Sequence, residues 1–187
     1  MKKIILSAIA VMAFGFANAQ QTKFGVKAGV QFANLTGDIE ENSSKVGFQV
    51  GGFAEIKLSE KFAVQPELLY STQGTKVDFG SEDLKYNLDY LNIPVMAKYY
   101  VAEKFSLEAG PQIGFLLSAK AKVEDEKEDI KDGLKSIDFG LNFGAGYDFT
   151  ENLSAGVRYN LGLSNINDEG DGEIKNSVFS LAVGYKF

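Results

Sequence analysis

The sequence predicts an all-β fold: an eight-stranded antiparallel transmembrane up-and-down β-barrel with short periplasmic turns and long extracellular loops. Two observations carry this prediction. Apolar and polar residues alternate with period two in successive segments from residue 23 onward, and the connections between segments are short and long in turn. Alternation over about ten residues is typical of a strand with one apolar and one polar face. Tight turns that alternate with long polar loops are typical of outer-membrane barrels.

The alternation defines each strand in order. In the first, Phe24, Val26 and Ala28 alternate with Gly25 and Lys27. The expected strands are 23–34, 45–57, 62–75, 87–101, 105–118, 137–149, 153–164 and 177–187. The short connections are 58–61, 102–104 and 150–152, and the long connections are 35–44, 76–86, 119–136 and 165–176. An even number of strands places both ends of the barrel on the short-turn, periplasmic side.

The start of the chain has the three regions of a secretory signal peptide. Residues 2–3 are basic, residues 4–16 are mostly apolar, and residues 17–19 (Ala-Asn-Ala) supply the small side chains that a signal peptidase reads. The apolar run is too short to span about 30 Å of hydrocarbon as a helix. We therefore expect cleavage after Ala19 and one barrel domain, 20–187, in the cell outer membrane.

The direction of the apolar face separates a membrane barrel from a soluble calycin-like barrel, whose apolar residues point inward. The apolar face of the expected strands carries no charge. A lipid-facing surface requires this, because a Lys or Arg at the bilayer midplane costs ~2–4 kcal/mol. The opposite face combines glycines with the charges, which suits a narrow interior. The sequence therefore predicts apolar side chains on the outside, in contact with outer-membrane lipid.

Aromatic residues of the apolar face gather near both ends of the strands, as at two membrane interfaces. The belt expected beside the short turns is Phe24, Phe62, Tyr99, Phe105, Phe149 and Tyr185. The belt expected beside the long loops is Phe32, Phe48, Tyr70, Phe115 and Phe179. The terminal Phe187 resembles the signal read by the outer-membrane assembly machinery, which is a second expected partner. The alternative is an ordinary last strand with one more belt residue.

The polar face carries equal numbers of basic and acidic residues. The basic ones are Lys27, Lys57, Lys98, Arg158 and Lys186, and the acidic ones are Glu55, Glu67, Glu108, Asp138 and Asp148. Because a buried charge needs a partner, this balance predicts a filled lumen with no open pore. We expect a structural charge network of Glu55, Glu67, Lys98, Glu108 and Arg158, in which Arg158 pairs with Glu67 or Glu108.

Composition excludes several classes of function. The chain contains no His, Cys or Trp, so it offers no histidine base, no cysteine nucleophile and no His- or Cys-ligated zinc. Carboxylate-only chemistry by Glu67 and Glu108 remains, but a lumen salt-bridge network is favoured because opposite charges share that face. We expect no enzymatic activity and no cofactor. A formal net charge of −6 argues against a nucleic-acid partner.

Two acidic segments in the long connections have more than one interpretation. Residues 123–135 interleave acids with lysines, which fits a short surface helix with i,i+4 pairs or a solvated loop. Residues 167–173 combine oxygen ligands with glycines, so calcium binding is one interpretation. An exposed acidic turn is favoured, because the spacing is not that of an EF-hand.

Three segments carry a family resemblance. Residues 65–71 (Gln-Pro-Glu-Leu-Leu-Tyr-Ser), 90–98 (Tyr-Leu-Asn-Ile-Pro-Val-Met-Ala-Lys) and 108–114 (Glu-Ala-Gly-Pro-Gln-Ile-Gly) resemble the PorT-like outer-membrane β-barrel family of the Bacteroidota. The resemblance spans essentially the whole mature chain and implies an eight-stranded outer-membrane barrel. The namesake is linked to protein secretion and gliding machinery, but a shared fold does not transfer that role.

The same segments hold all three prolines, Pro66, Pro94 and Pro111, inside expected strands, where each removes a ladder hydrogen bond. Bulges, or amides turned away from the neighbouring strand, would relieve this loss. The phase of the apolar residues also changes near Tyr90 and Leu91. This change favours a bulge at that point of the strand.

Three function classes follow. The first is a structural or surface-interaction barrel that works through its extracellular loops. The second is an accessory component of an envelope secretion machine. The third is a small transporter for an apolar ligand, but only a few apolar residues, among them Phe53, Leu69, Met96 and Leu116, share the polar face.

Overall fold

The computed structural model describes residues 22–38, 42–78, 83–123, 126–168, 170 and 172–187, and the expected signal peptide lies outside them. Eight strands form the barrel: β1 (Thr22–Gly37), β2 (Asn42–Lys57), β3 (Phe62–Asp78), β4 (Asp83–Ala102), β5 (Phe105–Val123), β7 (Ile137–Asp148), β8 (Leu153–Gly162) and β9 (Ile174–Lys186). A short strand, β6 (Glu126–Asp129), pairs with the end of β5, and a single-turn 3-10 helix, η2 (Lys131–Gly133), follows it.

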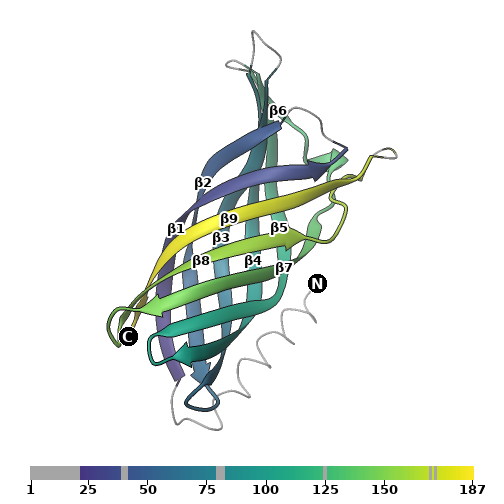
Figure 1. Cartoon of the computed structure of the whole chain (residues 1–187). Coiled ribbons are helices and arrows are strands. Elements are labelled where there is room, and N and C mark those ends of the chain that lie inside the picture. The colour runs from purple at the N-terminus through teal and green to yellow at the C-terminus, as the bar shows by residue number, and fades with distance from the viewer. Residues whose placement is uncertain (1–21, 39–41, 79–82, 124–125, 169, 171) are drawn as a thin grey trace.

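Hydrogen bonds join the eight strands into a closed antiparallel barrel (Figure 1). Each barrel strand pairs with the next one along the chain, and β1 pairs with β9 to close the ring. This up-and-down order confirms the fold class predicted from the alternation. Within the described residues, no helix is both long and apolar enough to cross a membrane.

The strands extend further at the long-loop end than the alternation indicates. β3 and β4 stay paired as far as Asp78 and Asp83, and β5 continues to Val123 beside β6. The expected loops 76–86 and 119–136 therefore contain much strand. Their residues are mostly polar on both faces, so they give no period-two signal. The two interpretations of 123–135, a surface helix or a solvated loop, were both wrong for its described part, which holds β6 and η2.

The side chains take the faces that the alternation predicts. In β1, Phe24 and Val26 are about half exposed on the outside, while Gly25 and Gln31 are buried. Every aromatic residue of the two expected belts lies on the outer face, which also carries Phe139, Phe143 and Tyr159. Cross-strand pairs join four of these rings into one row around the barrel, in the order Phe143, Tyr159, Phe179 and Phe32. The two-belt interpretation includes Phe179 and Phe32 but not Phe143 and Tyr159.

Each proline lies in an interruption of a hydrogen-bonded ladder. The interruption in β2–β3 contains Pro66, that in β3–β4 contains Pro94, and that in β4–β5 contains Pro111. The register is the same on both sides of each interruption, so no residue is inserted there. Because proline has no N–H to donate, the ladder opens at the level where a donor is missing. The expected bulge is absent at each proline, and strand pairing is lost locally instead.

The bulge expected near Tyr90 is on the neighbouring strand. In β4, Leu88 and Tyr90 are buried and Leu91 faces outward, so β4 keeps a regular alternation. The β4–β5 register does shift between Asp89 and Tyr90, but the extra residue is Leu117 of β5. The apolar phase changes in the sequence because the barrel interior becomes apolar at this height. A bulge in β4 was therefore the wrong interpretation of that change.

Candidate functional site in the barrel lumen

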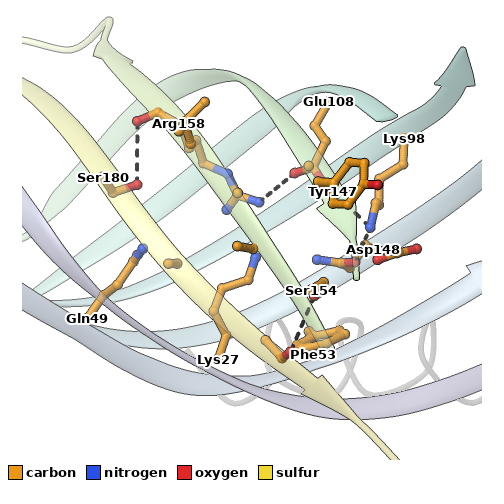
Figure 2. A pocket seen from close by; sticks show the side chains of 17 residues that line it. Lys27, Gln49, Phe53, Lys98, Glu108, Tyr147, Asp148, Ser154, Arg158 and Ser180 are labelled. Carbon is orange, nitrogen blue, oxygen red and sulfur yellow. Dashed lines mark hydrogen bonds and ion pairs between the residues drawn. The ribbon is translucent and has the colours of Figure 1, made fainter. Parts of the chain in front are cut away.

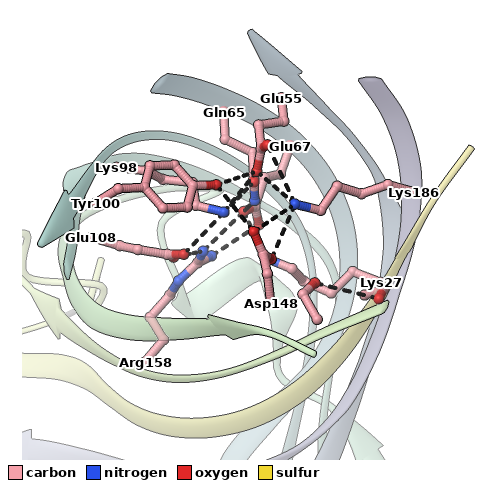
Figure 3. A network of polar contacts seen from close by, with 12 residues as sticks. Lys27, Glu55, Gln65, Glu67, Lys98, Tyr100, Glu108, Asp148, Arg158 and Lys186 are labelled. Carbon is pink, nitrogen blue, oxygen red and sulfur yellow. Dashed lines mark hydrogen bonds and ion pairs between the residues drawn. The ribbon is translucent and has the colours of Figure 1, made fainter. Parts of the chain in front are cut away.

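Eight charged side chains meet inside the barrel toward its short-turn end, and every barrel strand contributes one of them. They are Lys27 (β1), Glu55 (β2), Glu67 (β3), Lys98 (β4), Glu108 (β5), Asp148 (β7), Arg158 (β8) and Lys186 (β9). Ion pairs join all eight into one continuous set, which we call the lumen charge chain (Figure 3). Four members are basic and four are acidic, so their formal charges cancel.

Arg158 links two carboxylates of the lumen charge chain. Its Nη1 and Nη2 donate to Oε2 and Oε1 of Glu67, each over 2.9 Å, and Nη2 also donates to Oε2 of Glu108 over 3.1 Å. Lys27 Nζ and Gln65 Nε2 donate to Glu67 Oε1 as well, both over 2.7 Å. The Glu67 side chain is 0% exposed. Arg158 therefore pairs with both of the carboxylates that the sequence offered as alternatives.

The rest of the lumen charge chain runs from Lys98 toward the short turns. Lys98 Nζ lies 3.5 Å from Glu108 Oε1 and 2.8 Å from Glu55 Oε2, so it links the two carboxylates. Lys186 Nζ then joins Glu55, over 3.3 Å, to Asp148, over 3.1 Å. Every carboxylate of the chain has a cation within ion-pairing distance, which offsets the loss of hydration that burial causes.

Small residues make room for these long side chains. A Cβ atom on Gly146 would lie 2.8 Å from Glu108 Oε1, and a Cβ atom on Gly25 would lie 2.4 Å from Cζ of Phe53. Figure 2 shows Phe53 and Lys27 beside the space that Arg158 and Glu108 enter. At these two positions a side chain from another strand occupies the space that a larger residue would need, whereas at Gly51 and Gly110 the nearest atoms are the backbone of the neighbouring strand.

A neutral polar layer and then an apolar layer lie beyond the charges. The polar layer consists of hydrogen-bonded amides and a hydroxyl, from Gln31, Gln49, Ser71, Gln73, Gln112, Asn142 and Asn160. At the long-loop end a cluster that we call the outer plug is fully buried; its members are Leu35, Leu88, Tyr90, Leu116, Ala119 and Ile166. Ile166 belongs to the connection after β8, and its backbone bonds Lys135 and Ile174. This loop residue therefore closes the barrel from above.

Two of the ten charged residues on the polar face are not members of the lumen charge chain. The Lys57 ammonium lies over the ring of Tyr100, 5.5 Å from its centroid, at the exposed rim. Asp138 is buried higher up, where it accepts hydrogen bonds from Ser164 over 2.7 Å and Asn176 over 2.8 Å. Equal numbers of acidic and basic residues on one face do not show which of these residues lie at the same height in the barrel.

Gln65 and Tyr100 also form hydrogen bonds with members of the lumen charge chain. The sequence analysis did not single out these two residues. Gln65 accepts from Lys98 over 3.2 Å, and the Tyr100 hydroxyl donates to Glu55 over 3.1 Å. Each lies two residues from a charge of the chain, so the same period-two alternation that placed the charges inside would also have found them.

The chemistry of this arrangement is the mutual neutralisation of charges. Within the described residues, no group of three or more His, Cys, Asp or Glu is placed to hold a metal ion. Two residues of the acidic segment 167–173, at positions 169 and 171, lie outside that description. The lumen charge chain and the outer plug lie at two levels of the barrel interior.

A closed eight-stranded barrel with an apolar exterior and a charged, filled interior defines a small outer-membrane β-barrel. The model of the family described as "Outer membrane protein beta-barrel domain" matches residues 18–168 of this chain. The chain therefore belongs to that family of outer-membrane β-barrels. No curated protein matches the chain in sequence.

Solved structures share this fold at low sequence identity. Neisserial surface protein A is 19% identical with a TM-score of 0.60, and the match covers 90% of this chain and 100% of that one. A major outer membrane protein from Thermus thermophilus is 15% identical with a TM-score of 0.54, over 90% and 100%. Ail of Yersinia pestis, solved with the heparin analogue sucrose octasulfate, is 17% identical with a TM-score of 0.51, over 90% and 100%. These similarities show the fold alone.

Proposed function

We propose that this barrel is a surface-interaction protein of the outer membrane that conducts nothing through its lumen and works through its extracellular end. The observation that carries the proposal is the double closure of the interior. The lumen charge chain crosses the barrel toward the periplasmic end, and the outer plug covers the extracellular end. A solute would have to break charge-assisted hydrogen bonds at one level and buried apolar packing at the other.

The extracellular end offers the surface that the interior lacks. β3, β4 and β5 run past the barrel rim with β6 beside them, as the upper part of Figure 1 shows. The connections around η2 and Ile166 are held to each other by backbone hydrogen bonds, including Asp168 N to Gly133 O over 3.1 Å. Such a surface on a rigid scaffold is where binding residues are usually found. The proposal includes no catalytic step, because the charges of the lumen chain bind one another.

The test is conductance of the purified protein in planar lipid bilayers, together with protease treatment of intact cells. We expect no stable conductance steps, and we expect digestion of the extracellular connections while the strands persist. Arg158→Ala is the matched variant, because it removes the central link of the charge chain without touching the outer plug. Steady conductance by the unmodified protein would contradict the closed lumen. If the protein in intact cells were fully protected from the protease, the proposed exposed outer surface would be contradicted.

We also propose that the chain is a PorT-like member of its family, exported with cleavage after Ala19 and assembled through a signal that ends on Phe187. The three segments that carry the PorT-like resemblance supply Glu67, Lys98 and Glu108 of the charge chain as well as the prolines at the ladder interruptions. The resemblance therefore concerns the barrel's architecture, and it does not favour a role in secretion. Co-purification of this barrel with secretion subunits after mild crosslinking would contradict that view.

A further inference from the structure

Asp138 carries a buried carboxyl group beside the outer plug. It accepts hydrogen bonds from the Ser164 hydroxyl over 2.7 Å and from Nδ2 of Asn176 over 2.8 Å. The residue is 6% exposed, and among the described residues no lysine or arginine forms an ion pair with it. Every carboxylate of the lumen charge chain, by contrast, has such a cation. Because a buried charge without a partner is unfavourable, this carboxyl group is suited to change its charge.

The described side chains that pack around Asp138 are uncharged. A Cβ atom on Gly114 of β5 would lie within 3.7 Å of Asp138, Tyr90 and Asn92, so these side chains meet at one point. Of the neighbours only Tyr90 can titrate, and its hydroxyl accepts a hydrogen bond from Asn176 over 3.2 Å. The charged residues of the neighbouring connections are exposed or bound elsewhere; they are Lys131, Asp132, Lys135, Asp168, Glu173 and Lys175.

The position of Asp138 fastens the connection after β8 to the barrel. Ser164 begins this connection, which carries Ile166 into the outer plug. The Ser164 hydroxyl also accepts a hydrogen bond from the backbone N–H of Phe139 over 2.8 Å, so it is fixed to β7 at two atoms. Asn176 links the same carboxyl group to β9. A change at Asp138 would therefore act directly on the segment that closes the extracellular end.

The side-chain amide of Asn176 can accommodate two charge states of its neighbour. Its Oδ1 is buried and has no hydrogen-bond partner among the described residues. An amide presents an acceptor on one side and two donors on the other, so a turn of 180° exchanges them with little change of shape. Once turned, Oδ1 would accept from a protonated Asp138 and from the Tyr90 hydroxyl, and Nδ2 would take the place in which Oδ1 has no partner.

We propose that Asp138 makes the outer plug sensitive to protons: its uncharged form keeps the connection after β8 closed on the barrel, and its ionisation loosens that connection. The uncharged carboxyl group keeps the bond from Ser164 and needs no cation. The ionised group has lost its hydration without gaining a cation, and it regains water only if the connection lifts. The extracellular end should therefore loosen as the pH rises. This inference goes beyond the surface-interaction proposal, because it concerns how the plug closes and not what binds outside.

The test is hydrogen–deuterium exchange of the full barrel in detergent micelles at about pH 5 and about pH 8, with rates corrected for the intrinsic effect of pH. The amides followed are those of Lys135 and Ile166, which hold the connection through backbone hydrogen bonds of 2.8 Å. In the unmodified barrel their protection should fall at least about tenfold between the two conditions. Asp138→Asn stays uncharged and can donate to the turned Asn176, so it should keep high protection at both. Asp132→Asn, which changes an exposed acid, is the matched control and should behave like the unmodified barrel.

Three results would overturn the proposal. Constant protection in the unmodified barrel would show that the plug does not respond to pH, and an equal fall in Asp138→Asn would show that another group titrates. Low protection of Asp138→Asn under both conditions would show that the charge itself holds the connection.

A second measurement covers the case in which Asp138→Asn shows no heat-dependent shift in SDS migration and so does not fold. Infrared spectroscopy of the unmodified barrel should show a protonated carboxyl group at about pH 6, where ordinary carboxyl groups are ionised. Its band should disappear over the same pH range in which protection falls. The absence of this band at about pH 6 would contradict an uncharged Asp138 in the closed plug.

Discussion

Replacing Arg158 by alanine should destabilise the barrel by several kilocalories per mole, because this residue joins two buried carboxylates. The change removes three charge-assisted hydrogen bonds, two to Glu67 and one to Glu108. Breaking a buried ion pair from one side costs about 3–5 kcal/mol, since the remaining charge stays buried without its partner. Glu67 keeps Lys27 at 2.7 Å, but Glu108 keeps only Lys98 at 3.5 Å. We therefore expect the lower part of this range, about 3 kcal/mol.

The assay is urea unfolding of the barrel in lipid bilayers, followed by tyrosine fluorescence or by loss of the compact band in SDS. With a slope of about 2 kcal/mol per molar urea, about 3 kcal/mol moves the midpoint down by about 1.5 M. Lys120→Ala is the control, because this lysine is exposed beyond the rim and its loss should cost less than about 0.5 kcal/mol. Arg158→Lys should fall between the two, since lysine keeps the charge but loses the two-pronged contact. Equal midpoints for Arg158→Ala and Lys120→Ala would refute the reasoning.

Three further predictions concern the ends of the barrel and of the chain. Ile166→Ala should loosen the outer plug, with a local cost of about 2–4 kcal/mol; limited trypsin digestion should then cleave after Lys135 faster than in the unmodified barrel, and an unchanged rate would contradict the packing. Phe187→Ser should lower the yield of assembled barrel in the outer membrane while its refolding in detergent stays normal, whereas normal yield would make Phe187 an ordinary belt residue. N-terminal sequencing of the protein from membranes should start at Gln20, and a chain that retains Ala19 would contradict the expected cleavage.

The sequence predicted the barrel because lipid and lumen impose opposite requirements on alternate residues. Phe24 and Val26 have to face lipid, and Lys27 has to face inward, so each strand identifies its own faces. The pairing of Arg158 was also foreseeable, because Glu67 and Glu108 lie at similar distances from the short turns. The alternation predicts which side chains are inside, and the strand lengths predict roughly how high each one lies.

The features that the sequence did not predict depend on packing inside the barrel, and the pattern of a single strand does not show that packing. Leu88 and Tyr90 suggested a change of phase because apolar residues were assigned to the outside, whereas they pack on Ile166 in the outer plug. The extra residue, Leu117, sits in a run of apolar residues that hides the shift. Which charges meet depends on height as well as face, so Asp138 shares the polar face with the lumen charge chain but does not join it.

The most direct test of the central account is the migration of the outer-membrane fraction in SDS with and without boiling. A closed barrel has a complete ladder with no free edge, so the unheated chain should stay folded in SDS and shift its position after heating. We predict that shift, in the membrane fraction, for the chain that begins at Gln20. Recovery of the chain as a soluble periplasmic protein that migrates identically with and without heating would contradict a lipid-facing exterior and reverse the assignment of the two strand faces.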